Sequence, residues 1–184
     1  LVRVGSGGQP VAACLPTIYC SLSAGHFAPP DAPDHYREKL ITLPHLGCCY
    51  EPLVTNEIEI ALDELGIDTR LPIFVCPRVP FKYLPQHDRL FVEIAKRLQQ
   101  RCQFVFFHHL KENLSARLEE RLEVAFEEAG LFFPSHGLFL PWLKRDAFYG
   151  LLRKSDVYLD TVGFSGFNTA MQAIECGLPI VTKE

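Results

Sequence analysis

The sequence predicts an α/β fold built on a parallel sheet, and three observations support this. From about residue 71 onward, short apolar runs alternate with segments of helical periodicity. Glycine and proline separate these segments, and the connections between them are short. Alternating elements of this kind form parallel strands joined by helices that cover both faces of the sheet. Ligands of such folds bind at the carboxyl ends of the strands.

The first part of the chain gives a weaker signal. Residues 1–55 are rich in Pro, Gly and Cys and show little periodicity. The first helical pattern covers residues 56–65, and Gly66 is its expected end. We therefore expect the organisation of the chain to change near residue 71.

Five strands and four helices are expected after that point. The strands cover residues 73–76, 104–107, 138–140, 157–160 and 180–182. The helices cover residues 87–100, 115–130, 145–154 and 168–176.

Apolar spacing and terminal signals define these helices. In the first, Leu90, Phe91 and Ile94 share one face. Ser115 is the expected N-cap of the second helix, whose outer face is charged and is interpreted as solvated surface. Gly177 ends the last helix, because glycine readily adopts the left-handed conformation found there.

Composition disfavours two classes of partner. The chain has 184 residues, 48% of them hydrophobic, which is enough to bury a core. Its net charge of −4 argues against a broad nucleic-acid-binding surface. No apolar run approaches the roughly 20 residues that span a bilayer. Neither nucleic acid nor membrane is therefore an expected partner.

Cysteine and histidine usage predicts a cytoplasmic protein without a metal site. The seven cysteines form no CxxC pair and lie along apolar segments, which is typical of reduced thiols. The adjacent His108 and His109 lack an HExxH context or a nearby ligand pair, so a metal is not expected there. Because the chain starts without Met or a signal peptide, we expect it to be a fragment of a longer protein.

A small-residue loop near the end of the chain is the strongest candidate binding site. The strand before it ends in Asp160, and Gly163, Ser165 and Gly166 precede a helix that begins at Asn168. Unpaired backbone N–H groups at a helix N-terminus stabilise an anion such as phosphate. The alternative is an ordinary strand–helix connection that binds nothing.

Four segments, taken together, resemble a known family. The segment FKYLP at 81–85 is similar to the F/Y-K-x-x-P segment of the O-linked N-acetylglucosamine transferase family. So are LDT with the following G-x-x-T at 159–169, GLPIVT at 177–182, and HYREKL with the following LP at 35–44. These anchors cover most of the chain in the family's order, and the similarity is to its bacterial, SPINDLY-type members.

The resemblance implies a GT-B glycosyltransferase with two Rossmann-like lobes. Residues 1–70 would end the N-terminal, acceptor-side lobe, and residues 71–184 would form the first part of the C-terminal lobe, which binds the nucleotide sugar. The implied reaction transfers a sugar, expected to be GlcNAc, from a UDP-sugar to protein side chains with inversion. The UDP-sugar is the donor substrate and no cofactor is expected. Tetratricopeptide repeats are an expected part of the full-length chain.

The same resemblance implies a set of donor-binding residues. Lys82 neutralises the diphosphate leaving group, and with a helix N-terminus beside it no metal is needed. The other expected contacts are Leu143, Phe148, Ser165, Gly166, Phe167, Asn168, Thr169 and Gln172. The loop and helix residues hold the diphosphate. The Leu143 backbone reads the edge of the uracil, Phe148 lies against it, and Gln172 is near the ribose.

Simpler interpretations stay open for several of these residues. Lys82 can be a solvent-exposed lysine, and Phe148 can be a core residue. Asn168 and Thr169 can serve only as helix caps, since both residue types are good caps.

The chain also departs from the family pattern. Ala12, Ala13 and Cys14 stand where the family has T-S-G, and Tyr19 stands where it has an acid. The alternatives are therefore a catalytically inactive nucleotide-sugar-binding module, or another GT-B enzyme with a glycan or lipid acceptor. A dinucleotide-binding reductase is disfavoured, because no G-x-G-x-x-G follows the strand at 73–76. We expect the isolated fragment to have no transferase activity.

Overall fold

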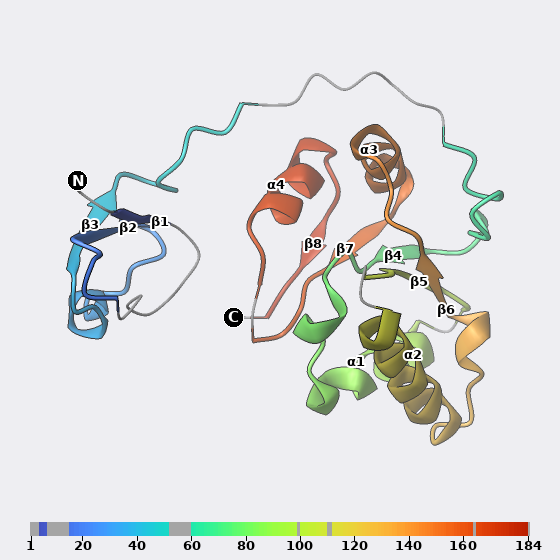
Figure 1. Cartoon of the computed structure of the whole chain (residues 1–184). Helices are drawn as coiled ribbons and strands as arrows, with labels where there is room; N and C mark the ends of the chain where they lie inside the picture. Colours follow the sequence, from blue (N-terminus) through green and yellow to red (C-terminus); the bar gives the residue numbers. More distant parts are fainter. Residues whose placement is uncertain are drawn as a thin grey trace. The chain divides into compact units, whose positions relative to one another are not determined.

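The computed structural model describes residues 4–6, 15–51, 60–98, 100–109, 112–163 and 165–183 (Figure 1). The chain divides into two compact units, Leu1–Leu53 and Val54–Glu184. Each unit holds a parallel sheet, of three strands in the first and five in the second.

The first unit contains strands that the sequence did not predict. They are β1 (Val4–Ser6), β2 (Cys20–Ala24) and β3 (Lys39–Leu43), in the order β1-β2-β3. A short 3-10 helix, η1, covers Ala32–His35. No residue of β3 is buried, so the strand lacks the contrast between buried and exposed positions that periodicity arguments need.

The helix expected at residues 56–65 is not found where it can be tested. Residues 56–59 lie outside the described residues, and residues 62–66 form a turn in which Gly66 has a φ of 78°. Ile60, Leu62 and Ile67 are buried in the core of the second unit. The boundary between the two compact units in the sequence follows residue 53, and the division into two enzyme lobes at residue 71 stays a prediction.

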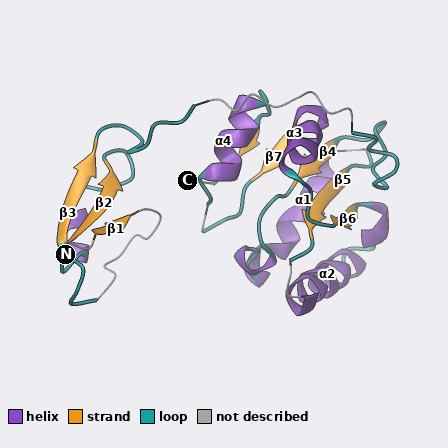
Figure 2. Cartoon of the chain, turned by 45° about the horizontal axis from the view of Figure 1, so that its top comes forward, coloured by secondary structure: helices purple, strands orange, loops and turns teal. Residues whose placement is uncertain are grey.

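The second unit has the predicted five-stranded parallel sheet with helices on both faces (Figures 1 and 2). The strand order is β6-β5-β4-β7-β8. The strands are β4 (Ile73–Val75), β5 (Gln103–Phe107), β6 (Gly137–Leu140), β7 (Val157–Leu159) and β8 (Ile180–Val181). The helices are α1 (Asp88–Arg97), α2 (Glu112–Glu127), α3 (Arg145–Lys154) and α4 (Asn168–Glu175). Three 3-10 turns, η2 (Pro80–Lys82), η3 (Pro85–His87) and η4 (Phe133–Ser135), lie in the connections.

Two cores lie on the two faces of this sheet, and the strands alternate between them. Phe104 and Phe106 point to the α1–α2 side, where each lies 5.3 Å from the Phe91 ring, centroid to centroid. Val75 and Val105 point to the α3–α4 side, which is mainly aliphatic. The period of two in a buried strand therefore separates an aromatic layer from an aliphatic one.

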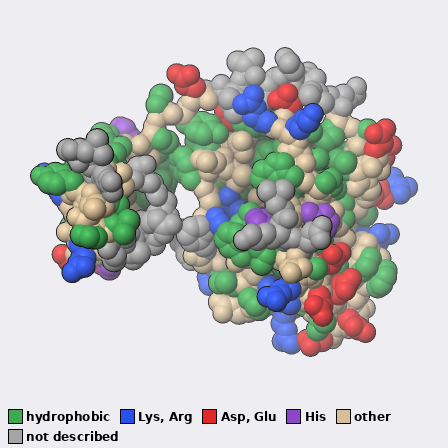
Figure 3. Space-filling view, in the orientation of Figure 1, with side chains coloured by type: hydrophobic (Ala, Val, Ile, Leu, Met, Phe, Trp, Pro, Cys, Tyr) green, Lys and Arg blue, Asp and Glu red, His purple; other side chains and the backbone are tan. Residues whose placement is uncertain are grey.

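The start of α2 corrects one prediction. Ser115 was the expected N-cap, but α2 begins at Glu112 and Ser115 lies inside it. The Ser115 hydroxyl accepts the backbone N–H of His109 at 2.8 Å, so it holds the chain that leaves β5. The predicted charged outer face is present, and acidic side chains gather over α2 in Figure 3.

No cysteine that the structure describes is in a disulfide. Cys76 and Cys102 are buried, and burial raises the pKa of the Cys102 thiol to about 11. Within the described ranges, no helix combines the length and apolar character needed to cross a bilayer.

Gly137 offers a test of the packing between β6 and η4. An added methyl group would collide with the ring of Phe133, which is only 3% exposed. We expect Gly137→Ala to lower the free energy of unfolding by about 1–3 kcal/mol, the usual cost of overpacking a core. Urea denaturation of the chain measures this. The same substitution in a Phe133→Leu background is expected to cost less, and an equal loss in both backgrounds would contradict the explanation.

Candidate functional site

Three strand ends converge at one edge of the second unit. The strands β4, β7 and β8 are neighbours and run parallel, so their carboxyl ends lie side by side. The segments that leave β4 and β7 are therefore brought together there, although about 80 residues separate them.

A buried ion pair joins these two segments. Arg78 follows β4, and its Nε and Nη2 donate to Oδ1 of Asp160 at 3.1 and 3.0 Å. The two side chains are 6% and 3% exposed. Burying either charge alone would be costly, so the two residues must be buried together.

Asp160 also binds groups from its own loop and from the residue that follows β8. Its Oδ1 accepts the backbone N–H of Thr161 at 3.0 Å. Its Oδ2 accepts the hydroxyl of Ser165 and, at 3.3 Å, that of Thr182. The carboxylate therefore has a partner for each oxygen and connects all three strand ends.

Arg78 reaches from this pair into the glycine loop. Its Nη2 donates to the Gly166 carbonyl at 2.8 Å, and its Nη1 donates to Oγ1 of Thr169. A Cβ at Gly166 would overlap the guanidinium, so glycine is required there for close approach. Gly163 is required for a different reason, a φ of 93°.

The β4 segment is held in place by Tyr83. The backbone N–H of Arg78 donates to the Tyr83 hydroxyl at 3.2 Å, and that hydroxyl donates to the Cys76 carbonyl at 2.6 Å. Tyr83 is buried, and burial raises the pKa of its phenol well above the usual value. The neutral phenol thus closes a turn that presents Lys82 at the sheet edge.

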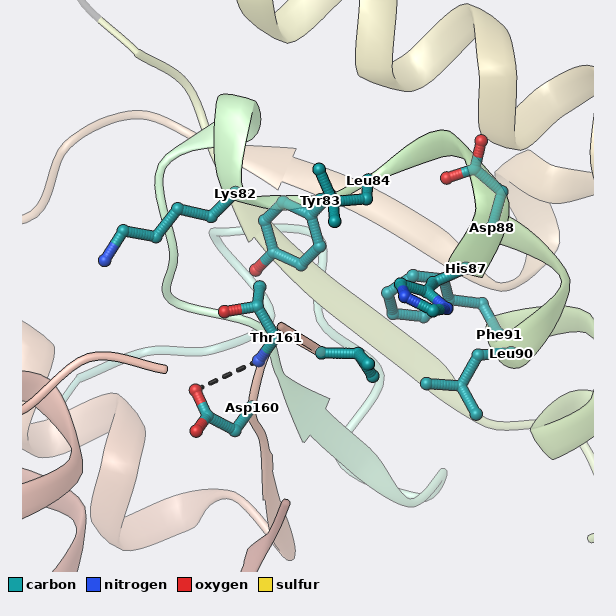
Figure 4. Close-up of a pocket in the computed structure, with 10 residues that line it drawn as sticks. Lys82, Tyr83, Leu84, His87, Asp88, Leu90, Phe91, Asp160 and Thr161 are labelled. Carbon is teal, nitrogen blue, oxygen red and sulfur yellow. Dashed lines mark hydrogen bonds between the residues drawn. The ribbon is translucent and has the colours of Figure 1, made fainter. Parts of the chain in front are cut away.

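Lys82 lies beside the ion pair. With Asp160 and Thr161 it lines a small hollow of about 10 Å³. Phe91 also lines this hollow, on the other side of the Tyr83 ring (Figure 4). Burial lowers the pKa of Lys82, and the nearby Arg78 charge acts in the same direction, opposed by Asp160. A hollow of this volume accommodates about one water molecule, far less than a nucleotide.

The structure brings together four of the predicted site residues. Lys82, Ser165, Gly166 and Thr169 all lie around the Arg78–Asp160 pair. Asn168 is exposed and begins α4.

The interpretation of Asn168 and Thr169 as helix caps only is wrong. The position that precedes α4 belongs to Phe167, and no side chain caps the helix there. The Thr169 hydroxyl instead bonds with Arg78 and Tyr158.

The remaining predicted residues lie apart from this cluster. Leu143 and Phe148 follow β6, an edge strand, and pack against the α3–α4 core. The Phe148 ring meets Phe107 edge-on at 5.7 Å. Gln172 is half-buried in α4, one turn after Thr169. Their roles toward the uracil and ribose stay predictions.

The two adjacent histidines have ordinary aromatic neighbours. The ring of His108 lies 5.5 Å from Phe139, and that of His109 lies 6.4 Å from Phe81. In the part of the chain that the structure describes, no group of three or more metal-binding side chains is placed to hold an ion.

Sequence reasoning missed Arg78 as a functional residue. It is the single charged residue in the apolar segment at 72–81, directly after a strand expected to be buried. A charge in that context needs a buried partner. Asp160 follows the neighbouring buried strand and is that partner. The pairing could not be predicted, because the local sequence pattern does not indicate which strands are neighbours in the sheet.

Comparisons with known proteins support the fold. No family model and no curated protein matches the sequence. Among solved structures, 98% of the chain matches an O-GlcNAc transferase from Thermobaculum terrenum, solved as a lysine-to-methionine mutant, with a TM-score of 0.76 and 21% identity. The chain spans 33% of that protein's length. This likeness confirms the predicted α/β fold of GT-B type with Rossmann-like parallel sheets.

The contact between Gly166 and Arg78 can be tested by a double substitution. We expect Gly166→Ala to destabilise the chain by about 1–3 kcal/mol, because the new methyl group displaces the guanidinium. In an Arg78→Lys background the planar head is absent, and the same change is expected to cost less. Urea denaturation of the four proteins gives both costs. Equal costs in the two backgrounds would show that Arg78 is not what requires glycine.

Proposed function

We propose that this chain belongs to a glycosyltransferase that transfers a sugar, GlcNAc, from a UDP-sugar to protein side chains, with inversion and without a metal. The observation that carries the proposal is the likeness over 98% of the chain to the O-GlcNAc transferase from Thermobaculum terrenum. A cytoplasmic location and attached tetratricopeptide repeats are parts of the same proposal.

The chemistry of the sheet edge supports it. Departure of UDP leaves extra negative charge on a diphosphate, which a preorganised positive site stabilises. The ammonium group of Lys82 and the first N–H groups of α4 both supply positive potential. The charge of Arg78 is matched by Asp160, so this proposal assigns the attraction of the diphosphate to Lys82 and to these N–H groups.

The hollow is small compared with a donor nucleotide. In this proposal the diphosphate therefore lies on the open edge beside the hollow, not inside it. It would contact Lys82 and the first turn of α4. In this proposal the base lies toward Leu143 and Phe148, and the ribose toward Gln172.

A second candidate is a module that binds a nucleotide sugar without catalysis. Tyr19 replaces the family's acid and is 71% exposed, and Ala12 to Cys14 replace T-S-G in residues outside those described. Calorimetric titration of the full-length protein with UDP, UDP-GlcNAc, UDP-glucose and NAD separates the candidates. Binding of UDP species with sugar transfer supports the transferase, and binding without turnover supports the module.

Lys82→Ala is expected to weaken UDP binding by about 1–3 kcal/mol, through loss of a charge-assisted contact. Calorimetric titration of the full-length protein measures the change. Lys96→Ala is a matched control, because Lys96 is an exposed lysine of α1. An unchanged affinity in Lys82→Ala would remove Lys82 from the site.

The lowered pKa of Lys82 predicts a pH dependence. The ammonium loses its proton at a lower pH than the usual lysine value of about 10.4, so the loss of UDP affinity begins below that pH. Lys82→Arg keeps its charge throughout this range, so its affinity should fall less. Titrations between about pH 7 and pH 10 compare the two proteins, which share any titration of the ligand itself. Identical declines would contradict this role for Lys82.

A further inference from the structure

Arg78 and Tyr158 both bond with the hydroxyl of Thr169. A hydroxyl has one proton to donate and two lone pairs that accept. Arg78 Nη1 donates to Thr169 Oγ1 and takes one lone pair. The phenol oxygen of Tyr158 lies 3.0 Å from the same Oγ1. The direction of this second hydrogen bond decides where the Thr169 proton points.

Tyr158 is the favoured donor of that bond. A phenol proton is more acidic than that of an aliphatic alcohol, so the phenol donates more strongly. Tyr158 is fully buried, and the Arg78 guanidinium carbon lies 5.3 Å from the centre of its ring. Burial raises the pKa of Tyr158 to about 12, which keeps the phenol protonated near neutral pH.

With both neighbours donating, the two lone pairs of Thr169 are filled and its proton is left over. Arg78 and Tyr158 are buried, whereas Thr169 is only partly buried and lies in the first turn of α4. The partial exposure of Thr169 leaves room for that proton on the open side of the first turn, toward which the N–H groups of the turn also point.

We propose that Arg78 and Tyr158 are positioning residues that direct the Thr169 proton toward the diphosphate of the donor. The inference rests on the proposed function. A phosphate oxygen is an acceptor, so a Thr169 lone pair aimed at it would weaken binding and a proton strengthens it. Arg78 does not act by direct attraction, because its charge is matched by Asp160.

The test compares affinities for UDP and UMP in the full-length protein by calorimetry. A general loss of structure would lower both affinities, whereas a misdirected proton lowers the preference for the diphosphate. Thr169→Val is expected to reduce UDP affinity about tenfold and UMP affinity much less. Thr169→Ser keeps a hydroxyl and is expected to retain the wild-type preference. Both variants keep the Arg78–Asp160 pair, so the test holds even if Arg78 variants do not fold.

Two further variants separate the directions of the hydrogen bonds. Arg78→Lys should lower the preference for UDP as Thr169→Val does. The single nitrogen of an ammonium cannot reach the separate positions that three guanidinium nitrogens reach at Asp160, Gly166 and Thr169. Combining Arg78→Lys with Thr169→Val should add no further loss of preference. Tyr158→Phe should lower UDP affinity, because one of the two donors that direct the Thr169 proton is lost. An unchanged affinity would remove Tyr158 from this role. If Thr169 instead donates to Tyr158, Tyr158→Phe would release the proton and raise UDP affinity.

Arg97→Lys is the matched control, because Arg97 is an exposed arginine whose side chain is 81% accessible. It is expected to change neither affinity. Wild-type binding of UDP with an unchanged preference in Thr169→Val, or a gain in Tyr158→Phe, overturns this inference alone. Absence of UDP binding by the wild type overturns the proposed function and this inference with it.

Discussion

The buried ion pair between Arg78 and Asp160 is the constraint on which the rest of the candidate site depends. An unpaired charge in this interior would be strongly destabilising, so each residue fixes the place of the other. Their pairing fastens the end of β4 to the end of β7, and Asp160 reaches β8 through Thr182. The same guanidinium holds the Gly166 carbonyl and the Thr169 hydroxyl. The positions of Gly166 and Thr169 before and at the start of α4 therefore follow from their contacts with the pair.

In this arrangement the ion pair contributes to the shape of the loop but not to its net charge. Arg78 is neutralised by Asp160, so the pair shapes the loop without making the edge positive. In the proposed donor site, the positive potential that attracts the diphosphate would come from Lys82 and from the N-terminus of α4. In the proposed transferase such a site would be preorganised for an anion, because its donors would be in place before charge develops on the leaving group. Replacing Lys82 should therefore affect anion binding more than folding, whereas replacing Arg78 affects both.

The strands and helices that could be predicted from the sequence are those with buried residues. After residue 71 every expected strand and helix is present, because buried strands such as β5 carry continuous apolar runs and helices such as α3 carry a clear apolar face. The helix expected at residues 56–65 is the exception in the second unit. The strands of the first unit were missed, since β3 has no buried residue to mark a face. The role of Ser115 was predicted wrongly, because a serine before an apolar stripe is typical of an N-cap. Its hydroxyl instead accepts the backbone N–H of His109, a contact that the local pattern does not indicate.

The sequence by itself determined the α/β class, the elements after residue 71 and the loop that contains Gly166, because these depend on local periodicity and on glycine. It also pointed to Lys82, through a segment that resembles a family motif. Only the tertiary structure decided that Arg78 and Asp160 meet, that Gly166 is glycine because a guanidinium lies against it, and that Thr169 is bonded from two sides. The physical reason is that β4 and β7 are neighbours in the sheet but about 80 residues apart in the chain, and strand order depends on packing of the whole domain.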